Sequence, residues 1–380
     1  MDFSLTKHEE LFLQMIKEFA EKEVKPLAAE IDERERFPTE TVEKMSKLGL
    51  MGIPFPVEYG GAGGTNQIYS MAVEELSRIC GTTGVVVSAH TSLCCAPIYE
   101  SGTEEQKRKY LPKLCSGEWL GAFGLTEPNA GTDAAGQQTT AVATEEGYVL
   151  NGNKIFITNA EYAHVYIVIA MTDKSLGTKG ISAFIVEKGT PGFSIGKKEK
   201  KLGIRGSATC ELIFENCVIP KENLLGKVNE GFKIAMKTLD GGRIGIAAQA
   251  LGIAQGAMDE TVKYTKERKQ FGKSISQFQN TQFQLADLET KIQASRLLVR
   301  VAAYKKDKKM PYSVDAAQAK LFAAETAMEV TVKAVQFHGG YGYTRDYPVE
   351  RMMRDAKITE IYEGTSEVQR MVISANLLKK

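Results

Sequence analysis

The feature that most constrains the fold is a change of sequence pattern near residue 121. From about 121 to 230 the chain is a series of short β-branched or aromatic runs separated by glycine-rich turns. Because no helical pattern separates these runs, we expect an antiparallel barrel or sandwich and not a parallel nucleotide-binding sheet. The runs that carry this prediction are residues 148–150, 154–158, 165–170 and 183–186.

Helical periodicity flanks this stretch on both sides. Before it, residues 40–48 and 69–80 have apolar side chains at three- and four-residue steps, and Thr103 followed by two glutamates predicts a capped helix start. After it, three long alanine-rich patterns joined by short loops predict a bundle at 243–266, 281–306 and 314–337. The predicted fold class is therefore α+β, with an N-terminal helical domain at 1–120, a middle β-domain at 121–230 and a C-terminal helical bundle at 231–380.

Length and charge exclude some classes of protein. A chain of 380 residues is long enough for two or three domains, and a net charge of +1 gives no case for nucleic acid as a partner. The six cysteines show no CxxC spacing, and the N-terminal pattern is neither a signal peptide nor a transit peptide. We therefore predict a cytoplasmic protein with reduced thiols and no membrane span.

Familiar catalytic signatures are absent from the sequence. There is no strand-GxGxxG-helix, no HExxH and no GxSxG, and the P-loop-like ending at 272–274 has Glu267 where the first glycine must stand. The four histidines are widely separated, so no metal site is expected. If the chain is an enzyme, its chemistry rests on carboxylates or on a cofactor.

Three polar segments could form a site, and each also has an ordinary explanation. The loop at 124–133 can present N–H groups and hydroxyls to a ring or phosphate, although an ordinary surface turn fits its spacing better. The glycine pair after residue 338 can admit a ligand or simply end a helix. The charged stretch 351–363 reads as a solvated helix face, except that Glu363 precedes a Gly-Thr break that leaves its side chain at an edge.

Taken together, these segments resemble the acyl-CoA dehydrogenase family along essentially the whole chain, and within it the bacterial short-chain (butyryl-CoA) members. The resemblance implies an N-terminal helical domain, a middle β-domain and a C-terminal four-helix bundle, assembled as a homotetramer. It also implies FAD between the β-domain and the bundle, with a neighbouring subunit completing the site. The matching pieces are GLTEP at 124–128, ITN at 157–159, LDGGR at 239–243, RKQFG at 268–272, QFHGGYG at 336–342 and IYEGT at 361–365.

The resemblance implies α,β-dehydrogenation of a short-chain acyl-CoA, butyryl-CoA to crotonyl-CoA or the reverse, with an electron-transferring flavoprotein as redox partner. Glu363 takes the α-proton, while a hydride passes from Cβ to flavin N5. A carboxylate suits this task if burial raises its pKa, and if hydrogen bonds from the Glu363 N–H and a flavin hydroxyl stabilise the enolate. Some relatives carry the base on a bundle helix instead, and that position is Gly242 here.

The family's binding positions carry over residue by residue. The positions implied for FAD are Phe123, Leu125, Thr126, Gly131, Thr132, Phe156, Thr158, Arg268, Phe271, Gln279, Gln336, Gly339, Gly340, Thr365 and Glu367. Those implied for acyl-CoA are Thr132, Asp240, Arg243, Tyr362 and Gly364. The alternatives are a dehydrogenase of branched-chain or other acyl-CoA, and a non-catalytic flavoprotein.

Overall fold

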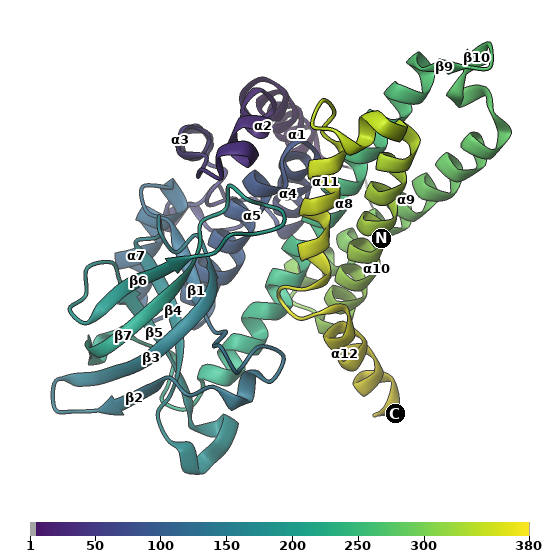
Figure 1. The fold of residues 1–380 in the computed structure, drawn as a ribbon. Helices are drawn as coiled ribbons and strands as arrows, with labels where there is room; N and C mark the ends of the chain where they lie inside the picture. The colour runs from purple at the N-terminus through teal and green to yellow at the C-terminus, as the bar shows by residue number, and fades with distance from the viewer. Residues whose placement is uncertain (1–4, 380) are drawn as a thin grey trace.

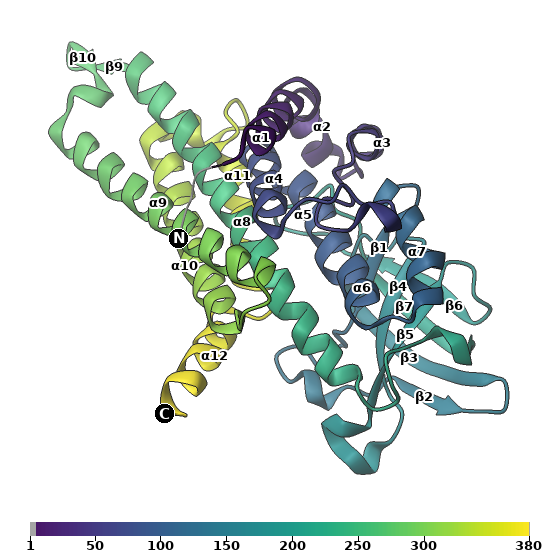
Figure 2. The same cartoon turned by 180° about the vertical axis from the view of Figure 1, so that it is seen from behind.

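The computed structural model describes residues 5–379, and its elements follow the predicted order of helices, sheet and helices (Figure 1). Seen from behind in Figure 2, the sheet lies on one side of the N-terminal helices and the long C-terminal helices lie on the other. The first region contains α1 (Lys7–Phe19), α2 (Lys25–Arg34), α3 (Thr39–Lys47), α4 (Asn66–Ile79), α5 (Gly81–Ala89), α6 (Ala96–Ser101) and α7 (Glu104–Ser116).

Two features of this first region are the capped start of α7 and a buried helical rod. The Thr103 side chain accepts a hydrogen bond from the Gln106 backbone N–H (3.2 Å), and the Gln106 side chain accepts one from the Thr103 N–H (3.0 Å), so α7 starts where its cap was predicted. Helix α5 continues through the π-helical turn η3 (His90–Cys95) into α6. Because residues 81–98 are all buried, this α5–η3–α6 rod is an internal wall of the molecule.

The middle region is one mixed sheet in the order β6-β7-β3-β2-β4-β5-β8, with β1 also paired to β4. Most neighbours are antiparallel as predicted, but β1 and β2 run parallel to β4. The reason is connectivity: β1 follows a helix and leaves through a long loop, and it is therefore not bound to a hairpin direction. The strands are β1 (Gly121–Gly124), β2 (Thr140–Ala143), β3 (Gly147–Thr158), β4 (Val165–Met171), β5 (Ile181–Glu187), β6 (Phe193–Lys198), β7 (Thr209–Pro220) and β8 (Leu224–Leu225).

The predicted runs 148–150 and 154–158 belong to one strand, β3. Register shifts against β7 fall between Leu150 and Gly152 and between Lys154 and Ile157. Such bulges interrupt the two-residue alternation and re-aim the side chains that follow them. The second bulge contains Phe156, which becomes important at the site.

Long helices form the last region. The predicted helix over 243–266 begins earlier, at Gly231, and α10 packs against α8, α9, α11 and α12. The short β9–β10 hairpin projects at the end of α8 and α9 that lies farthest from the sheet (Figure 1). Across residues 5–379, no helix is long and apolar enough to cross a membrane. The elements are α8 (Gly231–Glu267), β9 (Lys269–Gln270), β10 (Lys273–Ser274), α9 (Gln279–Asp307), α10 (Ser313–His338), α11 (Val349–Lys357) and α12 (Ser366–Leu378).

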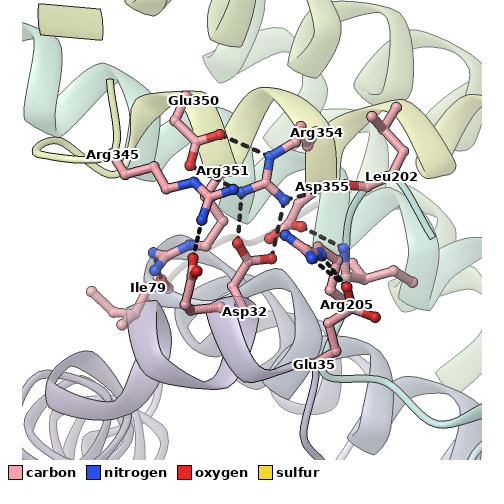
Figure 3. A network of polar contacts seen from close by, with 12 residues as sticks. Asp32, Glu35, Ile79, Leu202, Arg205, Arg345, Glu350, Arg351, Arg354 and Asp355 are labelled. Atoms are coloured by element: carbon pink, nitrogen blue, oxygen red, sulfur yellow. Dashed lines mark hydrogen bonds and ion pairs between the residues drawn. The ribbon is translucent and has the colours of Figure 1, made fainter. Parts of the chain in front are cut away.

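A polar network fixes α11 against the two other regions (Figure 3). Arg354 binds Asp32 of α2 (2.6 Å) and Glu350 of its own helix (2.8 Å). Asp355, which is buried, accepts a hydrogen bond from the Ile204 N–H (2.5 Å) in the loop before β7. Since the segment 361–365 follows α11 after a single turn, η9 (Ile358–Glu360), this network also sets where that segment lies.

Candidate active site

Side chains from all three regions line one cavity of about 190 Å³. Its walls are the loop after β1, the end of β3, the α5–η3–α6 rod, the first turns of α8 and the segment before α12. The predicted site residues that line it are Phe123, Leu125, Thr126, Gly131, Thr132, Phe156, Thr158, Arg243, Tyr362, Glu363 and Gly364. The remaining lining residues are mostly apolar: Val85, Ala89, Leu93, Ala134, Ile157, Met236, Leu239 and Val368.

Glu363 lies at a break in the chain between η9 and α12. Its φ is +54°, in the left-handed region that side chains other than glycine rarely adopt, and Gly364 follows with φ +92°. Thr365 then caps α12 by accepting a hydrogen bond from the Val368 N–H (3.4 Å). A left-handed glutamate costs about 1 kcal/mol or more, so the surrounding contacts must hold it in place.

The carboxyl group of Glu363 is enclosed although the residue as a whole is only half-buried. Its Oε2 atom is inaccessible to water and has no hydrogen-bond partner among the described residues. Burial raises the pKa of Glu363 to about 8, against the opposing effects of Lys320 and Arg243. The group therefore exchanges its proton at a pH above that of an ordinary glutamate, and its unpartnered oxygen lies against α8 at Gly242 beside the cavity.

Gly242 on α8 provides the space for this carboxyl group. A Cβ at this position would collide with the Glu363 carboxylate, whose Cδ lies 2.9 Å away, and with Leu93 Cδ2 at 2.8 Å. A side chain at residue 242 and the side chain of Glu363 therefore compete for one volume. In this chain glycine leaves the volume open, and glutamate fills it from the other side.

The loop after β1 is fixed by a buried ion pair that the sequence reading did not identify. Lys154, with 0% of its side chain exposed, donates to Glu127 Oε1 (2.7 Å), to the Leu125 carbonyl (3.0 Å) and to Gln137 Oε1 (3.1 Å). Glu127 also accepts from the backbone N–H groups of residues 138 and 139. A lysine directly before the apolar run 155–157 was the available signal.

Phe156 presents an apolar ring at the mouth of the cavity. It has φ +59°, and 59% of the residue is exposed, because the β3 bulge turns it out of the sheet. An exposed phenylalanine in a strained conformation is unusual for a side chain that only packs in a core. Its position next to Thr158 and the 124–132 loop suits contact with a flat aromatic ligand.

The predicted substrate residues divide into two sets. Thr132, Arg243, Tyr362 and Gly364 line the cavity, whereas Asp240 lies behind it. Asp240 accepts from Arg243 Nη1 (2.6 Å) and from Ser313 Oγ (2.9 Å), so its position is that of a support for Arg243.

The remaining predicted flavin residues lie elsewhere in the chain. The loops at the far ends of α8 and α10 form a second hollow that contains Arg268, Gln336, Gly339 and Gly340. Phe271, 94% exposed, and Gln279 lie on the projecting hairpin and at the start of α9. Thr365 and Glu367 lie at the start of α12. One chain therefore does not bring the Arg268 group to the cavity, whereas Thr365 lies between Gly364 and Val368, which line it.

Comparison with known proteins gives consistent matches over the full length. Residues 6–118, 122–217 and 229–378 match the N-terminal, middle and C-terminal domains of acyl-CoA dehydrogenase. A short-chain specific acyl-CoA dehydrogenase of Clostridium acetobutylicum is 64% identical over 379 residues, covering 100% of each chain. Butyryl-CoA dehydrogenase from Megasphaera elsdenii superposes with a TM-score of 0.98 at 53% identity, again covering 100% of each chain.

A second solved structure that matches this chain concerns the electron transferring flavoprotein of Acidaminococcus fermentans and the mechanism of flavin-based electron bifurcation. A chain in that structure has a TM-score of 0.99 and 59% identity, covering 100% of both chains. The fold, the cavity and these matches define the class: the chain belongs to the acyl-CoA dehydrogenase family, whose members use FAD. Within that family it is similar to the short-chain specific acyl-CoA dehydrogenases of Clostridium acetobutylicum and Megasphaera elsdenii.

Proposed function

We propose that this protein interconverts a short-chain acyl-CoA and its trans-2-enoyl-CoA, butyryl-CoA and crotonyl-CoA being the pair tested, with Glu363 as the base. The observation that carries the proposal is the enclosed, unpartnered Oε2 of Glu363 in a mostly apolar cavity. A buried carboxyl group without a hydrogen-bond partner reduces the stability of the fold, and such groups are typical of catalytic sites. A raised pKa also matches proton abstraction from a weak carbon acid.

The reaction removes one proton and one hydride, and a double bond forms between Cα and Cβ. Glu363 takes the α-proton on its free oxygen, and the apolar lining keeps water from competing for that oxygen. Bound FAD supplies the two-electron acceptor for the β-hydride. The Glu363 N–H is our proposed donor to the thioester oxygen, where negative charge develops.

The cavity residues fit a flavin ring. Phe123, Thr126, Phe156 and Thr158 combine an apolar face with hydroxyl and backbone donors around one opening. We propose that the second hollow, with Arg268, holds the pyrophosphate and adenosine of a cofactor bound mainly to a neighbouring subunit. Because one chain keeps the two groups apart, the site needs at least a dimer, and we propose the homotetramer.

The helical region offers surface for such assembly. Large apolar side chains are exposed on α9, α10 and the hairpin, as expected of an obligate interface: Phe271, Phe283, Leu297, Phe322 and Val332. We also propose domain limits at residues 120 and 230, where helices give way to the sheet and return. The six cysteines are free and buried, which supports the proposed cytoplasmic location.

An electron-transferring flavoprotein is the proposed redox partner, on the strength of the match to a chain in such a protein's structure. A second assay tests whether the protein and its partner flavoprotein together carry out flavin-based electron bifurcation. It mixes the two purified proteins with NADH, ferredoxin and crotonyl-CoA. Ferredoxin reduction that depends on crotonyl-CoA is the positive result, and NADH oxidation without reduced ferredoxin restricts the protein to simple electron exchange.

The central test compares the wild type with the Glu363→Gln variant in anaerobic mixing with butyryl-CoA. We expect the variant to retain yellow FAD and to bind acyl-CoA, but to lose flavin bleaching by about 10³-fold or more, since the amide cannot accept the proton. Bleaching at the wild-type rate would refute Glu363 as the base. Failure of both proteins to bleach, with FAD bound, would favour a non-catalytic flavoprotein.

The competing substrate class is branched-chain or other acyl-CoA. Anaerobic flavin reduction across straight chains of increasing length and across isobutyryl-CoA and isovaleryl-CoA separates the classes. We expect the highest kcat/KM with butyryl-CoA. A branched thioester reduced at least tenfold more efficiently would replace the short straight chain as the substrate.

A further inference from the structure

Lys320, on the face of α10 that turns toward the cavity segment, is a buried cation that the reaction as proposed does not use. Its side chain is 0% exposed, and its Nζ donates to the Gly364 carbonyl at 2.7 Å. Among residues 5–379 it makes no salt bridge with a carboxylate within 4.0 Å. A fully buried lysine without an ionic partner is rare because its desolvation is uncompensated.

The carbonyl that Lys320 holds belongs to the strained turn carrying Glu363. Gln369 of α12 donates to the same carbonyl (2.9 Å) and to the Glu363 carbonyl (3.3 Å). Two helices thus hold the left-handed pair Glu363–Gly364 by its backbone oxygens. The energy that keeps a strained glutamate in place must come from such contacts.

Charged and titratable groups lie near Glu363 on several elements. They differ in whether they already form a salt bridge with another residue. From α8, Arg243 approaches, but it is bound to Asp240 (2.6 Å). From α4 comes the buried hydroxyl of Tyr69, and Tyr362 lies beside Glu363 in the chain. Glu360 and Glu367 act on Lys320 from η9 and α12. Within the described part of the chain, residues 5–379, Lys320 is therefore the cation near Glu363 that has no carboxylate bound to it.

We infer that Lys320 is a positioning residue for the base: its ammonium group holds the turn through the Gly364 carbonyl, and its uncompensated charge stabilises the carboxylate form of Glu363. This inference rests on the proposed role of Glu363. The two effects are separable, because Gln369 holds the same carbonyl without carrying charge. Burial lowers the pKa of Lys320 to about 8, while Glu363 opposes that shift, which agrees with the two groups acting on each other.

The test measures the pH dependence of anaerobic flavin reduction by butyryl-CoA in holoenzyme variants. In Lys320→Met, loss of the cation removes a charge that lowers the pKa of Glu363, so the rise in rate should move to higher pH by about one unit. Lys320→Arg, which keeps the charge, should retain the wild-type midpoint. Gln369→Leu should lower the rate at every pH without moving the midpoint.

A matched control is Lys333→Met on the same helix, since that ammonium bonds Gln284 (3.0 Å) and not the turn. It should leave rate and midpoint unchanged. A Lys320→Met midpoint equal to the wild type, or an equal shift in Gln369→Leu, would overturn the charge role. If Lys320→Met does not fold, Lys320→Gln carries the same expectation.

These results remain distinct from those for the base itself. If Glu363→Gln bleaches at the wild-type rate, the assignment of Glu363 as the base fails, and the role of Lys320 fails with it. If Glu363→Gln is inactive and Lys320→Met keeps the wild-type midpoint, only the role of Lys320 fails.

Discussion

At the scale of single residues, the site depends on the side chain of one residue and on the lack of a side chain at another. Glu363 carries the carboxylate, and Gly242 leaves the volume into which it reaches. Close-packed interiors tolerate little added volume, so even one methyl group at residue 242 should displace the acid.

We therefore predict that Gly242→Ala lowers the rate of flavin reduction by butyryl-CoA by about tenfold or more, because a shift of about 1 Å is enough to misplace a catalytic group. FAD content and the far-UV spectrum should remain those of the wild type. The control is Gly241→Ala, whose Cβ would come close to the end of the Lys306 side chain, with Nζ at 2.8 Å, and would otherwise make only an ordinary contact with the Tyr312 hydroxyl at 3.8 Å. Equal rates in both variants would contradict the steric account.

Sequence reasoning reached Glu363 through family resemblance and not through its spacing. The Gly-Thr break after it was readable, because glycine and threonine end and cap helices. Three features of Glu363 could not be predicted from local sequence: its unpartnered oxygen, its left-handed backbone and the hydrogen bond that Lys320 donates to the next residue. They depend on how α8 and α10, which are distant in sequence, pack around the segment 361–365.

At the scale of elements, the loop after β1 is the part most dependent on a single contact. Lys154 and Glu127 form a buried pair that also fixes Leu125 and Gln137. Removing one member of such a pair leaves the other charged and buried, which costs about 3–5 kcal/mol.

Lys154→Met is therefore expected to reduce the free energy of unfolding by about 3–5 kcal/mol and to weaken FAD retention. Lys197→Met is a suitable comparison, because its pair with Glu199 lies at the surface and contributes about 0–1 kcal/mol. Denaturant unfolding of both variants, with flavin release followed by fluorescence, measures the two effects. A Lys154→Met protein as stable as Lys197→Met would show that the pair does not fix the loop.

Most elements were predictable from local pattern, and the exceptions have a common cause. The cap at Thr103, the strand runs and the three long helices follow from residues near one another in sequence. The parallel pairing of β1 with β4 and the bulges of β3 depend on which strands become neighbours, which local pattern does not specify. Helix α8 begins at Gly231, where the helical region was expected to begin, and it includes the residues before the predicted helix 243–266.

At the scale of the whole molecule, the predicted cofactor residues form two groups that lie far apart in the folded subunit. The cavity group lies beside the sheet, and the Arg268 group lies near the projecting hairpin (Figure 1). A site made from both groups takes Glu363 from one subunit and Arg268 from another.

Subunit complementation tests this directly. Glu363→Gln and Arg268→Ala should each be inactive or depleted of FAD, whereas their co-expression should restore about a quarter of the wild-type sites by random pairing. The restored sites are those that combine Glu363 from one variant with Arg268 from the other. If no activity returns in verified hybrid oligomers, both residues serve the same subunit's site and the shared-site proposal fails.

The shared volume of Gly242 and Glu363 also has an evolutionary consequence. The space defines where the acid must lie, but not which segment supplies it, so a lineage could transfer the acid from the end of η9 to α8 without rebuilding the pocket. Such a transfer needs two changes. After the first, the pocket holds either two acids competing for one place or none at all. Moving the acid between these two segments in this chain therefore requires both changes together.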